Sequence, residues 1–226
     1  MRTLIYVPII HTSADLGSLA EEVNRKGVAN FGENMWRDHL RAIDGFWDAL
    51  FLYFDSINVS GARIFQDGMI VDGDAGLHII QEGEKAGSKN HQLVAKLLQR
   101  GAILIKTEDF NLVKKERDRL VNMIRAKATS AKILGLIIYK LTKKTLLKQR
   151  DEYIAQRIDQ TLEDGETGIL FIGAYHHVQP RLPLDIKIKE IKETRKIREY
   201  QALLPFYHKN KKRFEYLNRY LISKID

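Results

Sequence analysis

The sequence predicts an α/β protein with a mainly parallel sheet of four or five strands, helices on both faces, and further helices at the C-terminus. Two observations predict it: short apolar runs rich in β-branched residues recur along the 226-residue chain, and long segments with helical spacing separate them. Strands that alternate with helices pair in parallel, because each helix returns the chain to the same edge of the sheet.

The order of elements follows from the apolar patterns. We expect strands at residues 3–10, 62–66, 102–106, 168–172 and 185–188. Helical spacing covers residues 15–57 with breaks at glycines, then 77–84, 89–100, and 110 to about 165. Residues 190–225 give two helices broken at Pro205. We therefore predict an α/β domain at 1–189 and a basic helical extension at 190–226, packed on the domain or on a partner subunit.

Composition excludes several kinds of chemistry. The chain has no cysteine, so disulfides, a cysteine nucleophile and thiolate metal ligands are excluded. No apolar run approaches the roughly 20 residues that cross a bilayer. Because no cleavage signal follows the apolar N-terminal segment, we expect a cytoplasmic protein with no membrane partner.

Polar side chains follow four of the predicted strands at the point where each strand ends. His11, Asp67, Glu108 and His176 follow the first, second, third and fourth strands. The carboxyl ends of parallel strands meet at one edge of a sheet, so we expect these four residues to share a site. Two imidazoles and two carboxylates suit a divalent metal of unknown identity, or a general acid–base pair that needs no metal.

Each of these residues alone also has a structural interpretation. His11 could be a hydrogen-bonded core histidine, and Asp67 precedes a glycine in a common turn dipeptide. Glu108 lies in a Thr-Glu-Asp sequence that suits a helix N-terminus, with Thr107 as the cap. The coincidence of four strand ends favours a site.

Other polar residues lie near the predicted strand ends. Capping preference favours Ser88 as the cap of the helix at 89–100, while Asn90 or His91 could reach the rim of the site. Asp15 is expected to cap another helix. Of the adjacent histidines, His176 is the candidate, because side chains alternate in an extended backbone and the next histidine then points away.

The order of these motifs resembles the TraB/PrgY and TIKI superfamily, which is related to EreA/ChaN-like proteins. That family carries one GxxH motif at the end of its first strand and a second near the end of the domain. Gly173-Ala-Tyr-His176 matches the second motif. Pro8-Ile-Ile-His11 keeps the histidine of the first motif and lacks its glycine.

The resemblance extends over residues 3–188 through weaker similarities. "IFQDG" with Asp67 and "IKTED" with Glu108 are similar to two acidic strand ends of the family, and Arg150-Asp151 stands where the family has Arg-Asn or Arg-Asp. The resemblance implies an α/β fold with both histidines at one site and hydrolase-like chemistry. TIKI members are regarded as metal-dependent proteases, and the erythromycin-esterase branch uses a catalytic histidine.

Together these observations lead us to expect a hydrolase, either metal-dependent and peptidase-like or His-based and esterase-like, acting on a small molecule or peptide. His11, Glu108 and His176 are the candidate catalytic residues, with Arg150 binding a substrate anion or orienting a carboxylate. The candidate metal ligands are His11, Asp67, Glu108 and His176.

An alternative function follows from the net charge of +8, which is concentrated in two blocks. Residues 105–150 carry a net charge of about +9 and residues 186–226 about +7. A non-catalytic regulatory or binding protein could use such helices to hold nucleic acid or another polyanion. For the aromatic residues of the C-terminal block, docking on the domain or in a homodimer is the favoured interpretation over nucleic-acid binding.

Overall fold

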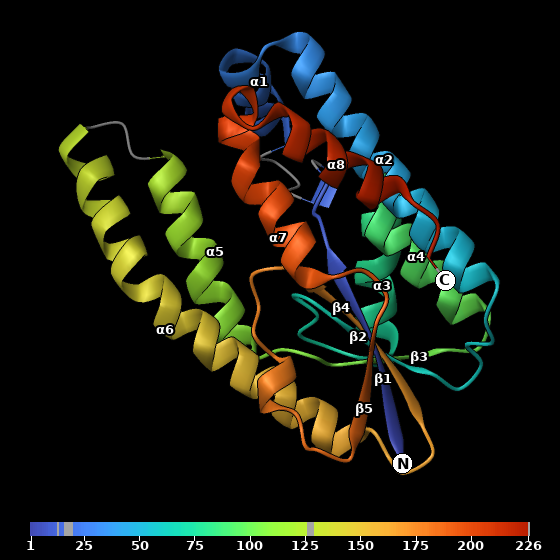
Figure 1. Ribbon diagram of the computed structural model, residues 1–226. Coiled ribbons are helices and arrows are strands. Elements are labelled where there is room, and N and C mark those ends of the chain that lie inside the picture. The colour runs from blue at the N-terminus through green and yellow to red at the C-terminus, as the bar shows by residue number, and fades with distance from the viewer. Residues whose placement is uncertain (13, 16–19, 126–128, 226) are drawn as a thin grey trace.

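One five-stranded sheet forms the centre of the molecule. The computed structural model describes residues 1–12, 14, 15, 20–125 and 129–225, without the side chains of 120 and 122–143. The strand order is β3-β2-β4-β1-β5, and every neighbouring pair is parallel. The strands are β1 (Arg2–Ile9), β2 (Arg63–Gln66), β3 (Ile103–Ile105), β4 (Thr167–Gly173) and β5 (Ile186–Glu190). The predicted fold class is confirmed (Figure 1).

Helices connect the strands and cover both faces of the sheet (Figure 1). They are α1 (Ala20–Phe31), α2 (Glu33–Asp55), α3 (Gly73–Lys85), α4 (Lys89–Gln99), α5 (Phe110–Arg125), α6 (Thr129–Thr161), α7 (Thr194–Leu203) and α8 (Lys211–Ile222), with short 3-10 segments η2 (Gln179–Arg181) and η3 (Leu204–Lys209). The expected break at a glycine occurs at Gly32, where φ is 80°. Gly27 lies inside α1, where a Cβ would meet the Trp36 ring at 2.4 Å.

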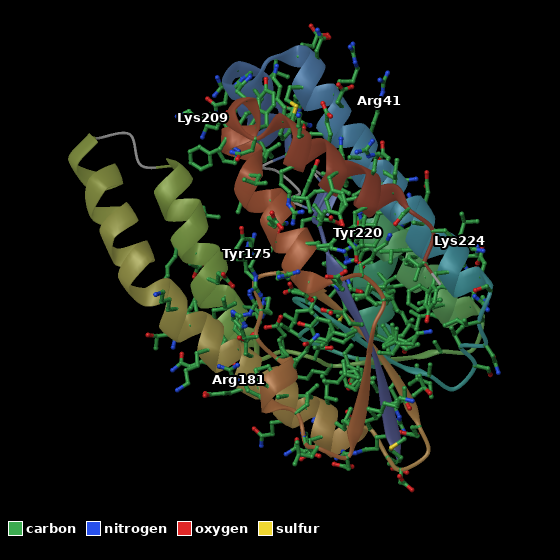
Figure 2. All side chains as sticks on the ribbon, viewed as in Figure 1. Arg41, Tyr175, Arg181, Lys209, Tyr220 and Lys224 are labelled. Atoms are coloured by element: carbon green, nitrogen blue, oxygen red, sulfur yellow. The ribbon has the colours of Figure 1, made fainter. Side chains whose placement is uncertain are left out.

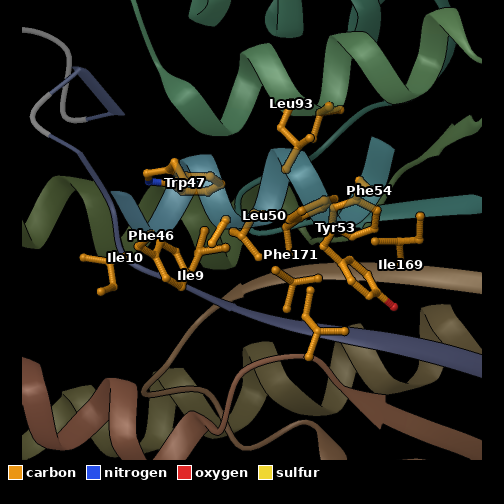
Figure 3. Packing of buried hydrophobic residues seen from close by; sticks show 14 of the residues in the cluster. Ile9, Ile10, Phe46, Trp47, Leu50, Tyr53, Phe54, Leu93, Ile169 and Phe171 are labelled. Carbon is orange, nitrogen blue, oxygen red and sulfur yellow. The ribbon is translucent and has the colours of Figure 1, made fainter. Parts of the chain in front are cut away.

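Alternating side chains of the central strands build two separate apolar cores. Ile5 and Val7 of β1 belong to the larger core, which α2, α4, α7 and α8 complete. Phe46 and Trp47 of α2 are fully buried in it (Figure 3). On the other face, Leu4 and Tyr6 pack with the C-terminal half of α6. Burial on both faces explains why these strands appear as continuous apolar runs in the sequence.

The C-terminal helices pack on the α/β domain itself. Phe214, Leu217 and Leu221 of α8 are buried in the same core as α2. Tyr200 of α7 stacks on Phe214 with ring centroids 4.9 Å apart, and its hydroxyl contacts His39 Nδ1 at 2.8 Å. These aromatic rings of the basic C-terminal block are therefore used inside the fold. A homodimer and a polyanion partner stay predictions.

Helices α5 and α6 run side by side as an antiparallel pair that extends beyond the sheet (Figure 1). Most of the basic block at 105–150 lies on this pair, and the side chains at 120 and 122–143 fall outside the described residues. In the described parts of the chain, no helix combines the length and apolar character needed to cross a membrane.

Candidate active site

The four polar residues that follow the strands meet at the carboxyl edge of the sheet. The Nε2 atoms of His11 and His176 lie 3.7 and 3.6 Å from the same oxygen, Oδ2 of Asp67. Glu108 joins them through Arg150, whose Nη2 donates hydrogen bonds to both Asp67 and Glu108. Residues that are far apart in sequence thus form one connected group, as expected for parallel strands at a switch in strand order.

The carboxylate of Asp151, which the sequence marks only by its place beside Arg150 in the resembled pattern, holds His176. The His176 side chain is 6% exposed, and its Nδ1 lies 2.6 Å from Asp151 Oδ1. Asp151 Oδ2 accepts the backbone N–H of His177 at 2.9 Å, so both carboxylate oxygens are engaged. Because an ionised carboxylate only accepts hydrogen bonds, Nδ1 carries the proton and Nε2 of the neutral ring is left as a base. The His177 side chain is exposed and lines the cleft beside His176.

Gly173 allows Asp67, His11 and His176 to approach its backbone closely. Its N–H donates to Asp67 Oδ2 at 3.1 Å. A Cβ at this position would lie 3.2 Å from Asp67 Oδ2, 3.6 Å from His11 Nε2 and 3.7 Å from His176 Cδ2. The glycine of the second GxxH motif therefore permits the two imidazoles and the carboxylate to surround a common space.

Pro8, which stands where the resembled family has a glycine, fits the strand without losing a hydrogen bond. Its register partner is Ile172 of β4. Tyr6 O accepts the N–H of Ile191, so the backbone polar groups of Tyr6 face the side of β5. The Pro8 nitrogen, two residues later in the strand, faces that same side. Strand β5 ends at Glu190, which pairs with Tyr6, so no neighbouring strand requires a donor from Pro8.

A polar network behind His11 was not foreseen from the sequence. Asp15 accepts hydrogen bonds from Thr12 N (2.5 Å), Thr12 Oγ1 (3.0 Å) and Ser88 Oγ. The residues that it would cap, 16–19, lie outside the described part of the chain, so its expected capping role stays a prediction. Ser88 is fully buried, caps α4 as predicted by accepting from His91 N, and contacts His91 Nδ1 at 2.8 Å. The network fixes the turn that carries His11, whose Nδ1 lies 4.0 Å from Asp15 Oδ2.

Arg150 is the centre of a buried group of carboxylates. Its Nε donates to Glu108 Oε2 at 2.6 Å, its Nη2 to Glu108 Oε1 and to Asp67 Oδ1, and its Nη1 to Glu116. Glu108 Oε1 also accepts the Gly68 N–H at 2.8 Å. Of the two expected roles of Arg150, the geometry supports orientation of carboxylates, because its guanidinium nitrogens are already engaged.

The helix after β3 begins differently from the expectation. Asp109, not Thr107, accepts the N–H of Leu112 at 3.0 Å and caps the first turn of α5. The Thr107 hydroxyl instead accepts the Gln66 N–H and donates to Ile105 O. Thr107 therefore ties β2 to β3, while Glu108 is turned inward to Arg150.

Electrostatic coupling to Asp67 sets the protonation of both histidines. Desolvation opposes the charged form of His176, but attraction to Asp67 and the hydrogen bond to Asp151 outweigh it and raise its pKa. His11 also has a raised pKa, because Asp67 and Asp15 outweigh desolvation, and 44% of its side chain stays exposed. Burial alone would raise the pKa of Asp67, but the two histidines and Arg150 hold it well below its usual range.

Two of the four predicted metal ligands, Asp67 and Glu108, are engaged by other groups of the chain. Glu108 directs its oxygens at Arg150 and the Gly68 N–H, and Asp67 directs its oxygens at Arg150 and the Gly173 N–H. The guanidinium already supplies the charge that a cation would bring. Within the described residues, no group of three or more His, Asp or Glu side chains is placed to hold a metal. These contacts suit acid–base chemistry by the side chains, and a bound divalent metal stays a prediction.

Comparison of the chain with protein-family models, with curated proteins and with solved structures finds no match. The resemblance to the TraB/PrgY and TIKI superfamily thus stays a hypothesis that rests on the motifs. The geometry of the site is the evidence that bears on function.

Proposed function

We propose that this chain is a hydrolase in which His176 acts as the general base on water, in the manner of a His-based esterase. The observation that carries the proposal is the Asp151–His176 pair, with Nε2 of the ring facing Asp67 close to Gly173 and His11. A base fixed by a buried carboxylate is the arrangement that orients imidazole in many hydrolases.

In the proposed reaction, His176 Nε2 takes a proton from water as the water oxygen attacks the carbonyl carbon of an ester. Asp151 accepts from Nδ1 throughout and stabilises the imidazolium that forms. The single bond between the carbonyl carbon and the leaving-group oxygen then breaks, and His176 returns the proton to the departing alkoxide. One water is consumed, and an acid and an alcohol are released.

His11 supplies positive charge at the same place. His11 and His176 face the same carboxylate, so the protonation of one imidazole affects the protonation of the other. The two histidines therefore titrate together with two apparent pKa values. When one ring is charged and the other neutral, the neutral ring acts as base and the charged ring stabilises the negative oxygen of the intermediate. The buried His176 is assigned as base, because Asp151 fixes its tautomer, and His11 as the cationic partner.

The motif resemblance supports the same branch of chemistry. The erythromycin-esterase branch of the superfamily uses a catalytic histidine, and His176 lies in the intact GxxH motif of this sequence. The Arg150–carboxylate group then has a positioning role: it fixes Asp67, which in turn faces both histidines.

The test is turnover of p-nitrophenyl acetate and butyrate by the purified chain, before and after treatment with EDTA. We expect hydrolysis above the rate of the His176→Ala variant, unchanged by EDTA because the side chains supply the chemistry. Turnover that EDTA abolishes and a divalent metal restores would contradict a metal-free site. Turnover equal in the wild type and in His176→Ala would contradict the assignment of the base.

The pH dependence of the reaction follows from the shifted pKa values. The base must be unprotonated, so activity should rise with pH through an apparent pKa above 6.5, the ordinary value for histidine. Asp67→Asn removes the charge that favours imidazolium, so the rising limb should move to lower pH. The measurement is kcat/KM as a function of pH for both proteins. A limb that Asp67→Asn leaves in place, or moves to higher pH, would show that Asp67 does not set the protonation of the base.

The close approach of the site residues to Gly173 gives a further prediction. Its φ is not positive, so Gly173→Ala imposes no left-handed strain, and the new Cβ would occupy the space shared by the two histidines and Asp67. We expect kcat/KM to fall about 10-fold to 100-fold, which corresponds to roughly 1.4–2.7 kcal/mol in the barrier, while circular dichroism shows a folded chain. Gly32→Ala tests a glycine at a helix break with positive φ and should lower stability without a comparable loss of kcat/KM. Full activity of Gly173→Ala would mean that the reaction does not use this space.

A further inference from the structure

A cleft of about 240 Å³ opens beside His176, on the side of β5 and α7. Its lining includes Tyr6 of β1, Glu190 at the end of β5, and Thr194, Arg195 and Arg198 of α7. His176 therefore belongs both to the candidate active site and to this cleft. A group bound in the cleft would lie next to the proposed base.

Arg198 is held in position at the cleft. Its Nε and Nη2 donate to Ala174 O at 3.0 and 2.8 Å. Its guanidinium carbon lies 5.9 Å from the centre of the Tyr175 ring, which Figure 2 labels in the space between α5 and α7. A guanidinium fixed by a carbonyl and an aromatic ring is pre-organised, so binding an anion through its other N–H groups costs little side-chain entropy.

Tyr6 brings an unused hydroxyl to the same cleft. Its side chain is 1% exposed, and its hydroxyl makes no hydrogen bond to any residue that the structure describes. A buried phenol normally has a partner, because leaving a polar group unpaired is costly. A ligand oxygen in the cleft would provide that partner.

The balance of charge in the cleft favours an anion. Arg195 and Arg198 contribute two positive charges, and Glu190 contributes one negative charge. Glu190 Oε1 is already engaged, because it accepts from Thr194 N at 2.9 Å, from Thr194 Oγ1, and from Gln179 Nε2 at 3.3 Å. The two guanidiniums are thus in excess over the carboxylate beside them.

We propose that the cleft binds an anionic group of the substrate, a carboxylate or a phosphate, through Arg195, Arg198 and the Tyr6 hydroxyl. The inference rests on the proposed hydrolase function and names the substrate class: an ester with a negative charge a few bonds from the carbonyl that is cleaved. The anion in the cleft places that carbonyl beside His176.

The test is equilibrium binding of succinate and of inorganic phosphate to the full chain, followed by calorimetry and by NMR shifts, because binding needs no turnover. The two probes distinguish a carboxylate site from a phosphate site. We expect Arg195→Met and Tyr6→Phe each to weaken binding about 10-fold, the loss of one hydrogen bond to a charged group. Arg41→Met is the matched control: this exposed arginine of α2 lies away from the cleft (Figure 2) and should leave binding unchanged.

A kinetic comparison completes the test. The p-nitrophenyl ester of succinic acid should have a kcat/KM about 10-fold or more above that of the acetate, and Arg195→Met should remove that preference. Binding of neither probe, or equal loss of binding in Arg195→Met and Arg41→Met, would overturn the proposed anion site even if the acetate is hydrolysed. Probe binding with no turnover of any ester would support the anion site and contradict the hydrolase.

Discussion

Replacement of His176 by alanine is expected to lower kcat/KM for an activated ester about 10²-fold to 10⁴-fold, the usual contribution of a positioned general base. His78→Ala is the matched control, because this exposed histidine lies on α3 and does not line the cleft beside His176. The control should keep the activity of the wild type. The comparison is made at a pH above the rising limb, where the base is unprotonated.

The His176→Ala variant also leaves Asp151 with one partner fewer, so a loss of activity must be separated from a loss of fold. Asp151→Asn provides the second measurement. An amide can donate to Nδ1 and so favours the tautomer with the proton on Nε2, which removes the base while the ring stays. A folded Asp151→Asn variant with the full kcat/KM would contradict the assigned role of the pair.

Replacement of Arg150 by methionine is expected to lower the free energy of unfolding by about 3–5 kcal/mol near neutral pH, the cost of removing one partner from a buried ion pair. Arg150 is 7% exposed, and its loss leaves Glu108, Asp67 and Glu116 without their shared cation. Urea denaturation, followed by circular dichroism and tryptophan fluorescence, measures the effect.

Arg213→Met is the control for the stability measurement. Arg213 pairs with Glu199 on the surface, where 46% of the arginine side chain is exposed, so its loss should change stability by roughly 0–1 kcal/mol. Burial raises the pKa of Glu108 against the opposing effect of Arg150, so without that arginine Glu108 takes up a proton more readily. Arg150→Met should therefore lose less stability relative to wild type at mildly acid pH. Equal effects of the two substitutions would mean that the buried carboxylates do not need Arg150.

Much of this fold could be predicted because the central strands are buried on both faces. The continuous apolar runs of β1 and β4 locate them without ambiguity, and short strands separated by helices imply parallel pairing. Parallel pairing in turn predicts that His11, Asp67 and His176 meet at one edge, which is where they lie. This prediction depends only on where the strands end, so an error in a helix boundary does not change it.

The partners within the site could not be predicted, because they depend on how distant segments pack. Asp151 lies 25 residues before His176 on a helix whose rotation decides which side chain faces β4. Asp15 likewise binds Thr12 and Ser88, and the contact with Ser88 joins segments 73 residues apart. In the sequence, Asp151 is indicated only by its place after Arg150, where the resembled family has Arg-Asn or Arg-Asp.

The most direct test is the protonation of His176, measured by ¹⁵N NMR across a pH titration of the wild type. The spectrum of His176→Ala identifies which signals belong to His176. The account predicts a neutral ring with the proton on Nδ1, an unprotonated Nε2, and an apparent pKa above 6.5. A neutral ring with its proton on Nε2, or an apparent pKa below 6.5, would contradict the claim that Asp151 and Asp67 prepare His176 as the base.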